Sequence, residues 1–304
     1  MTASVALLQT EPVEASDLTV VIPFRRDTPK RAENLCTVLR SLHAQLSGVD
    51  ILVIEDGPET ENPLSRQTGA LPAGARHVRR VHTGSFHRTR LLNHGMMNLT
   101  DRPFAASWDC DVLVYPGALA EALARLRAGA GAVFPHDGRF IDLRGTLRRN
   151  LIEAEGPADL PAPPWPKWRA IFPDWPWNKS GMVCLNTASE GGAVIVRRDA
   201  FAAAGGYHEG FRSWGFEDSE LVSRLTTLGL VPGHVAGWPL LHLSHERRRK
   251  VGWYEGRRTN QALCARMQRL SRDDILALIA AGGLRAPSEG PPLPEWPPFE
   301  VQGA

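Results

Sequence analysis

The sequence predicts an α/β protein whose mixed, mostly parallel central sheet is flanked by helices. Three neighbouring segments lead to this prediction. Residues 18–22 form a short apolar run rich in β-branched side chains, residues 30–46 carry apolar side chains at helical spacing, and residues 51–54 form a second apolar run. A strand, a helix and a strand in this order open a βαβ unit, in which the two strands are parallel.

The rest of the chain continues this alternation. Further strands are expected at 104–108, 130–134, 192–196 and 240–243. Further helices are expected at 88–99, 117–126, 199–204, in the segment ending at Leu228, and twice within 255–281. The second of these last two helices should begin at Ser271, because Asp274 three residues later completes a capping box.

Two segments interrupt the pattern. Residues 1–17 have no clear periodicity and are expected to be a loose leader. Residues 156–181 hold seven prolines and four tryptophans, and proline opposes regular pairing. Within them, the tryptophan-rich stretch 165–177 either covers the sheet or offers aromatic faces to a ligand. The tail 287–298 is rich in proline and is expected to be extended.

Composition excludes several classes of protein. The 304 residues include 35 basic and 33 acidic side chains, a net charge of +2, which argues against a general nucleic-acid-binding protein. The four cysteines are far apart and form no metal-binding or disulfide pattern. No secretory signal and no run of about 18 apolar residues is present, so a cytoplasmic protein without a membrane span is expected. The sequence leaves the oligomeric state open.

A pair of carboxylates, Asp109 and Asp111, directly follows the strand expected at 104–108. Ligands in open α/β sheets bind beyond the carboxyl ends of the strands. Two carboxylates two residues apart on an extended chain point to the same side, which suits a divalent cation that also holds a diphosphate. Taken alone, the pattern is more typical of a solvated turn.

Two further sets of side chains could carry chemistry. Glu217, Asp218 and Glu220 lie at an expected helix start after Trp214 and a glycine. Acids favour a first helical turn, but a carboxylate beside a glycine hinge could also act as a general base for a hydroxyl. His242 and His245 follow an apolar run and could complete the coordination of a metal held by a carboxylate, or simply pack.

Together these pieces resemble the GT-A nucleotide-sugar glycosyltransferases, most closely the β-1,4-galactosyltransferase-like branch, within families 2 and 7. Five segments carry the resemblance in the family's order, and together they cover roughly residues 18–250. They are Val21-Ile-Pro-Phe-Arg25, Val53-Ile-Glu-Asp-Gly57, Phe86-His-Arg-Thr-Arg-Leu-Leu-Asn-His-Gly95 with the aspartates at 109 and 111, Gly191-Gly-Ala-Val-Ile-Val196 with Trp214-Gly-Phe-Glu-Asp218, and His242-Leu-Ser-His-Glu246.

The resemblance implies a Rossmann-like GT-A catalytic domain at 18–254. Its nucleotide-binding half would span about 18–115 and its acceptor half about 130–254, with a helical and proline-rich extension at 255–304. It also implies a set of residues that contact the nucleotide sugar. They are Pro23, Phe24, Arg25, Asp56, Phe86, Arg88, Asp109, Cys110, Asp111, Gly192 and Trp214.

The implied roles differ along this set. Phe24 and Arg25 would line the nucleotide pocket, Asp56 would bond the base edge, and Phe86 would stack on uracil. Arg88 would touch the diphosphate, and Gly192 would let the backbone approach the donor sugar.

The resemblance also implies a metal site. Asp111 would bind Mn²⁺ or Mg²⁺ directly, while Asp109 would contact the ribose or the metal through water. His245 or His242 would complete the metal shell, with His245 favoured by the basic run that follows it. Asp218 would be the catalytic base, and Glu217 would orient the acceptor.

The implied activity is metal-dependent, inverting transfer of a hexose or N-acetylhexosamine from a UDP-sugar to a hydroxyl of a glycan or small molecule. A base-assisted single displacement inverts the anomeric carbon. The alternatives are a non-catalytic sugar-nucleotide or glycan-binding protein and a nucleotidyltransferase that makes sugar nucleotides.

Three positions depart from the family's pattern. Phe216 stands where the family usually has glycine, and Ser219 where it usually has aspartate, which favours a different acceptor. Ser189 replaces a large aromatic and would leave room for an N-acetylhexosamine.

Overall fold

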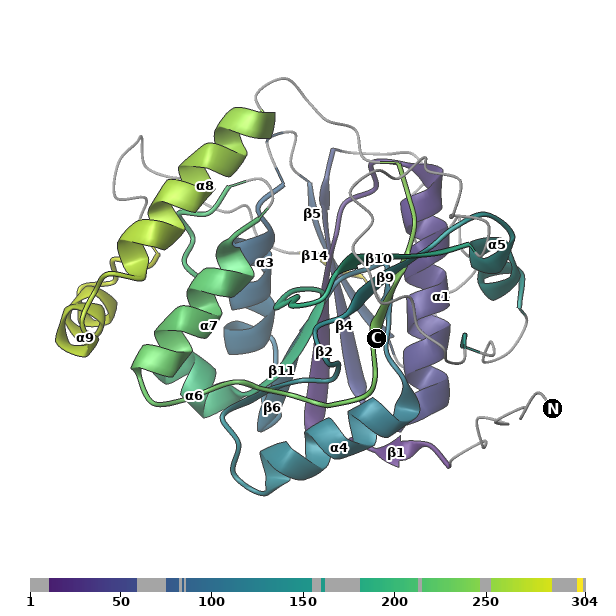
Figure 1. Cartoon of the computed structure of the whole chain (residues 1–304), viewed down its shortest axis with the longest axis horizontal. Coiled ribbons are helices and arrows are strands. Elements are labelled where there is room, and N and C mark those ends of the chain that lie inside the picture. The colour runs from purple at the N-terminus through teal and green to yellow at the C-terminus, as the bar shows by residue number, and fades with distance from the viewer. Residues whose placement is uncertain are drawn as a thin grey trace.

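A computed structural model describes residues 11–58, 75–81, 84, 86–154, 160–161, 181–212, 215–246, 253–285 and 300–302 (Figure 1). Its helices are α1 (Pro29–Gln45), α3 (Arg88–Asn93), the π-helix η1 (His94–Asn98), α4 (Pro116–Arg127), α5 (Gly145–Glu153), α6 (Arg198–Ala203), α7 (Glu217–Thr227), α8 (Trp253–Met267) and α9 (Arg272–Ala280). The tryptophan-rich stretch 165–177, Trp214 and the tail 287–298 lie outside the described residues.

The main sheet among the described residues has eight strands in the order β12-β8-β11-β6-β2-β4-β5-β14. Their bounds are β2 (Leu18–Phe24), β4 (Asp50–Gly57), β5 (Ala75–Val81), β6 (Phe104–Trp108), β8 (Ala132–Phe134), β11 (Ala193–Arg197), β12 (Gly233–His234) and β14 (Glu300–Gln302). The sheet is mixed. Strands β6, β2, β4 and β5 are parallel, while β11 runs antiparallel to both of its neighbours and β14 antiparallel to β5.

Helices cover both faces of this sheet, with α1 and α5 on one side and α3, α6 and α7 on the other (Figure 1). Strand β2 is buried at every position. Because side chains alternate along a strand, Val20 and Ile22 join the core beneath α1, whereas Val21 joins the core beneath α3 and α7. This two-sided burial explains why the strand reads as a continuous apolar run.

A second, four-stranded sheet has the order β10-β9-β13-β7. Its strands are β7 (Val112–Leu113), β9 (Phe140–Leu143), β10 (Met182–Asn186) and β13 (Leu240–Leu243). Strand β13 is antiparallel to β7 and parallel to β9. The small sheet therefore brings residues near 112, 142 and 242 to adjacent positions.

Some expectations need correction. The first strand does not end with the apolar run at residue 22, because β2 continues to Phe24 with Pro23 opposite Ile54. The segment 11–17 is not loose: β1 (Val13–Glu14) pairs with β3 (Leu46–Ser47), and Ala15 is fully buried.

The C-terminal region is confirmed in its helical part. Helices α8 and α9 form, and Ser271 and Asp274 make the expected capping box. Strand β14 was not expected, and it adds the chain's end to the edge of the main sheet next to β5.

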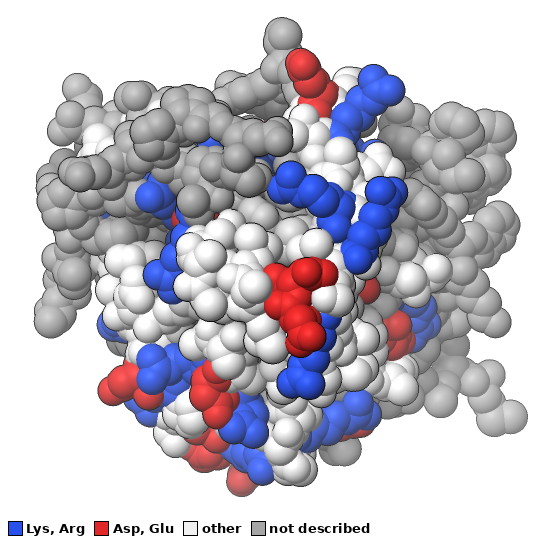
Figure 2. All heavy atoms as spheres, turned by 90° about the vertical axis from the view of Figure 1, so that its left-hand side faces the viewer, with Lys and Arg blue, Asp and Glu red and all other residues white. Residues whose placement is uncertain are grey.

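Surface charge agrees with the near-neutral composition. On the face shown in Figure 2, basic and acidic side chains are interspersed among wide uncharged areas. None of the four cysteines, all of which lie in the described part, forms a disulfide. No described helix is long and apolar enough to span a bilayer.

Candidate functional site

Asp111 lies in a tight turn between β6 and β7. The amide of Val112 donates to the carbonyl oxygen of Asp109 at 3.3 Å, so the chain reverses here instead of remaining extended. The amide of Leu243 donates to the carbonyl oxygen of Asp111 at 2.7 Å, and His242 stands opposite Val112 in the antiparallel register of β13 and β7. Sheet pairing therefore brings Asp111 beside the histidine segment.

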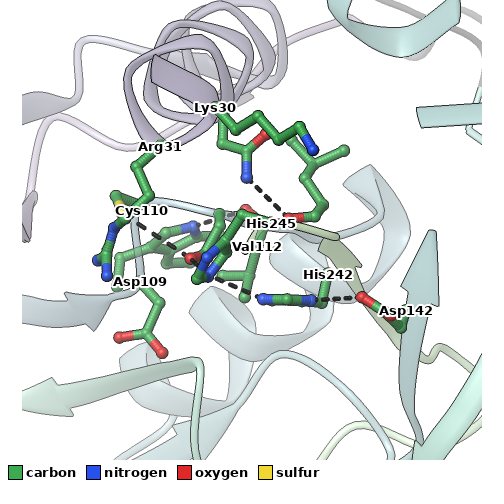
Figure 3. Close-up of polar contacts among 12 residues, drawn as sticks. Lys30, Arg31, Asp109, Cys110, Val112, Asp142, His242 and His245 are labelled. Carbon is green, nitrogen blue, oxygen red and sulfur yellow. Dashed lines mark hydrogen bonds and ion pairs between the residues drawn. The ribbon is translucent and has the colours of Figure 1, made fainter. Parts of the chain in front are cut away.

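Asp111, His242 and His245 form a three-donor cluster whose ligand atoms all lie within 4.8 Å of one another (Figure 3). Asp111 Oδ2 is 3.0 Å from His245 Nε2, and Asp111 Oδ1 is 3.8 Å from His242 Nε2. One carboxylate and two imidazoles form a donor set that divalent transition metals accept. The structure thus brings both candidate histidines to Asp111.

The orientation of both imidazoles fits a cation. His242 Nδ1 lies 2.7 Å from Asp142 Oδ1, so Nδ1 carries the proton and the lone pair of Nε2 faces Asp111. His245 Nδ1 is 3.0 Å from the carbonyl oxygen of Glu246 and must donate there, which turns a second lone pair toward the Asp111 carboxylate. Three electron-rich atoms this close need a proton or a cation between them.

Asp142 supports the cluster from behind. It stands opposite His242 in the parallel pairing of β9 with β13, and its carboxylate also binds Arg144. Burial opposes ionisation, but the hydrogen bond from His242 and the hydrogen bond and charge of Arg144 lower the pKa of Asp142. A carboxylate that holds the distal nitrogen of a metal-binding histidine typically fixes its tautomer and orientation.

The Asp111 carboxylate is ionised despite its burial. Burial alone would raise its pKa, but His242, His245 and the guanidinium of Arg31 lower the pKa well below its usual range. Arg31 also donates to Cys110 Sγ at 3.2 Å, and burial raises the pKa of that thiol to about 12. Cys110 is 1% exposed and packs into the core. Its side chain is therefore not open to a nucleotide sugar, although the resemblance implied such a contact.

Asp109 is not part of the three-donor cluster, and its carboxylate does not point to the same side as that of Asp111, contrary to expectation. The turn at 109–112 separates the two carboxylates, and that of Asp109 points away from the imidazoles (Figure 3). Asp109 Oδ1 instead accepts two hydrogen bonds from Arg88, at 3.1 Å from Nε and 2.9 Å from Nη2.

Arg88 gathers a second cluster of acids. Its Nη1 lies 3.2 Å from Asp218 Oδ1 and 3.7 Å from Glu217 Oε1, at the start of α7. The Tyr207 hydroxyl donates to Asp218 Oδ1 at 3.3 Å, and the Arg88 guanidinium carbon lies 5.8 Å from the centre of the Tyr207 ring. One arginine therefore offsets three carboxylates.

Burial and this imbalance of charge raise the pKa values of two acids in the cluster. Burial and the charge of Asp218 raise the pKa of Glu217 to about 7. Burial and the charge of Asp109 raise the pKa of Asp218, although Arg88 opposes the shift. Among the described residues, Glu217 Oε2 is one of the buried side-chain atoms without a hydrogen-bond partner. Such an atom is costly to bury alone and suits contact with a ligand.

Two glycines place the acids next to the 109–112 turn. The Asp109 amide donates to the Gly192 carbonyl oxygen at 2.8 Å. A Cβ on Gly191 would lie only 2.8 Å from Asp218 Oδ2. Gly192 has φ +93°, and a Cβ there would press on Leu240 and Val112. Only glycine allows Asp218 and the small sheet to approach this backbone so closely.

Of the residues expected to contact the nucleotide, some are buried in the core and others lie near Phe86. Pro23 and Phe24 are buried in β2, and Phe24 belongs to the core with no exposed surface, so its side chain does not line a pocket. Arg25 lies with its guanidinium carbon 5.6 Å from the centre of the Phe86 ring. Asp56 is fully buried, and its two carboxylate oxygens already accept hydrogen bonds from Arg25 and Arg80. Base contact by Asp56 and Phe86 stays a prediction.

Sequence reasoning missed Asp142 and Tyr207. Asp142 lies within the short strand Phe140–Leu143, which was not expected from the sequence, so its buried position gave no usable signal. Tyr207 follows the glycines 205 and 206 and gives no signal either. Its place beside Asp218 depends on Asn93, whose side chain bonds both the amide and the carbonyl of Tyr207.

One family model matches part of the chain. Residues 182–242 match the model of a family described as the N-terminal domain of galactosyltransferase. This segment contains Asp218 and His242 and ends within β13. No curated protein matches the chain.

Several solved structures are similar to the chain at low identity. One is the catalytic domain of Drosophila β1,4-galactosyltransferase 7 in complex with xylobiose, with 16% identity, coverage of 79% of this chain and 75% of that one, and a TM-score of 0.45. Another is a mutant of the same enzyme in complex with manganese, UDP-Gal and xylobiose, with 16% identity, coverage of 85% of this chain and 80% of that one, and a TM-score of 0.46. A third is a mannosyltransferase from Pyrobaculum calidifontis in complex with GDP-Man and Mn²⁺, with 14% identity, coverage of 93% of this chain and 77% of that one, and a TM-score of 0.48. The family match confirms the resemblance stated from the sequence: over residues 182–242 the chain is similar to galactosyltransferases.

Proposed function

We propose that the protein is a metal-dependent, inverting glycosyltransferase that moves a hexose or N-acetylhexosamine from a UDP-sugar to an acceptor hydroxyl. The observation that carries the proposal is the meeting of two clusters at one turn. Asp111 with two imidazoles lies on one side of residues 109–112, and Asp109 with Arg88 and Asp218 lies on the other. The family match over 182–242 supports it.

The three-donor cluster would hold the cation. Asp111, His242 and His245 would bind Mn²⁺ or Mg²⁺, and Asp142 would keep His242 in its ligating tautomer. A divalent cation bound there would supply charge that stabilises a leaving diphosphate. The buried guanidinium of Arg88, with 11% of its side chain exposed, would add a second positive charge.

The acids at the start of α7 would act on the acceptor. Asp218, held by Arg88 and Tyr207, would take the proton of the attacking hydroxyl. Glu217 Oε2, which is buried without a partner, would bind another hydroxyl of the acceptor and orient it. Attack assisted by a base on the face opposite the leaving group inverts the anomeric carbon.

A smaller feature bears on the choice of donor sugar. Ser189 is 8% exposed, and its hydroxyl accepts a hydrogen bond from the Gly191 amide at 3.4 Å. A serine in this place favours a donor with a bulky 2-substituent, such as an N-acetylhexosamine. Comparison of UDP-galactose with UDP-N-acetylhexosamines tests this choice, and a clear preference for galactose would contradict it.

The decisive experiment measures donor hydrolysis and transfer with Mn²⁺ across a panel of UDP- and GDP-sugars. Wild type should consume a UDP-sugar and give a product of opposite anomeric configuration by NMR. Asp111→Ala should lose metal-dependent nucleotide binding, whereas Asp218→Asn should keep that binding and lose transfer. Nucleotide binding by wild type without turnover of any donor would instead indicate a non-catalytic binding protein, and retention of configuration would refute inversion.

A further inference from the structure

The backbone that leads into α7 adopts a conformation that needs outside support. Phe216 has φ +73° and is the one non-glycine residue with positive φ among those described. Gly215 before it has φ +103°. Phe216 is also the N-cap of α7, where its side chain offers no oxygen to the first amides. The helix start that carries Glu217 and Asp218 is therefore neither relaxed nor capped by its own sequence.

Helix α8 supplies the support from outside the segment that matches the family model. Asn260, which is 1% exposed, donates from Nδ2 to the carbonyl oxygens of Arg212 at 2.8 Å and Gly215 at 3.0 Å. Its Oδ1 accepts from the Arg212 amide at 3.3 Å. A single buried amide group thus satisfies three backbone groups on the approach to α7.

A second side chain of α8 contacts Phe216, the residue that directly precedes Glu217 and Asp218. Arg257 lies three positions before Asn260, on the same face of the helix, and its guanidinium carbon is 5.2 Å from the centre of the Phe216 ring. Figure 1 shows α8 on the outer side of α7, away from the central sheet. Asn260 and Arg257 therefore contact the chain segment that precedes the acids.

We infer that Asn260 is a positioning residue that fixes Glu217 and Asp218 for reaction by clamping the backbone at Arg212 and Gly215. The expected effect on the transfer rate rests on the proposed function, whereas the hydrogen bonds between Asn260 and the backbone do not depend on it. Arg88 and Tyr207 hold Asp218 by its carboxylate, and Asn260 holds the backbone from which it projects. Misplacing a reacting group by about 1 Å can lower a rate ~100-fold.

The test compares Asn260→Ala and Asn260→Asp with wild type and with the control Gln261→Ala. Gln261 is the next residue on α8, carries the same amide and is exposed. We expect both Asn260 variants to lower kcat for transfer ~10- to 100-fold, with the Kd for Mn²⁺ and UDP unchanged, because the three-donor cluster is built from other elements. Asn260→Asp keeps the size of the side chain but turns a carboxylate toward two carbonyl oxygens, so it should be no more active than Asn260→Ala.

Hydrogen exchange provides a readout that does not need turnover. The Arg212 amide should exchange at least ~10-fold faster in Asn260→Ala, because its acceptor is gone, and should be unchanged in Gln261→Ala. Wild-type kcat in both Asn260 variants would overturn the inference, as would a loss of kcat matched by an equal loss of UDP binding. If wild type itself transfers no sugar, the proposed function fails, and unchanged exchange at Arg212 would then refute the clamp separately.

Discussion

Glu217→Gln should make the protein more stable at pH 8 than the wild type, by a margin that nearly disappears at pH 5. The pKa of Glu217 rises from its ordinary value of 4.5 in an unfolded chain to about 7 in the folded protein, because the carboxyl is buried and lies beside Asp218. The folded state then binds more protons than the unfolded state between these two values. Wild-type stability must therefore fall as the pH rises from 4.5 to 7.

The size of the effect follows from the same two pKa values. One pKa unit corresponds to ~1.4 kcal/mol, so ionising the buried group opposes folding by ~3 kcal/mol at pH 8 and by less than ~1 kcal/mol at pH 5. The neutral glutamine side chain does not titrate. We expect the gain in unfolding free energy of Glu217→Gln over wild type to grow by ~2 kcal/mol across this range.

Urea denaturation at pH 5, 6, 7 and 8 measures this difference, provided that the m-values of the two proteins agree. Glu255→Gln is the matched control, since Glu255 is an exposed acid in the first turn of α8. Loss of an exposed carboxylate should change the free energy of unfolding by no more than a few tenths of a kcal/mol. A difference between Glu217→Gln and wild type that stays constant from pH 5 to pH 8 would refute the assignment of a retained proton to this cluster.

Other perturbations address the rest of the site and the core. Asp142→Asn should weaken Mn²⁺ binding ~10- to 100-fold in calorimetry, because the bond that orients a ligating histidine is weakened; unchanged affinity would contradict its supporting role. Gly191→Ala should lower transfer while leaving metal binding intact, because the new Cβ would lie 2.8 Å from Asp218 Oδ2; full activity would show that Asp218 need not hold its place. Gly95→Ala should lower the free energy of unfolding by ~1–3 kcal/mol, because its Cβ would lie 2.5 Å from Val21 Cγ1; a neutral effect would mean that this helix packs less tightly than described.

Strand β2 and helix α1 were predictable because their burial leaves a local trace. Strand β2 is covered on both faces and reads as an apolar run, and α1 buries one face and repeats its apolar residues at helical spacing. The short strands β7, β9 and β12 leave no such trace, because each has four residues or fewer and forms only through pairing with distant segments.

The candidate site was predictable in its residue types but not in its grouping. Asp111 and His242 were identified from their positions after apolar runs, and the pairing of β13 with β7 brings them together. The position of Asp109 was not predictable, since the expected extended chain is a turn that directs its carboxylate toward Arg88. A turn of this kind is decided by contacts with Gly192 and β13, which periodicity does not report.

Anomalous diffraction from crystals soaked with MnCl₂ and UDP tests the central claim most directly. A manganese peak should lie within about 2.2 Å of a carboxylate oxygen of Asp111 and of the Nε2 atoms of His242 and His245, and it should vanish in Asp111→Ala. A peak coordinated by Asp109 without the two imidazoles, or no ordered manganese beside Asp111 at a concentration that supports turnover, would contradict the account.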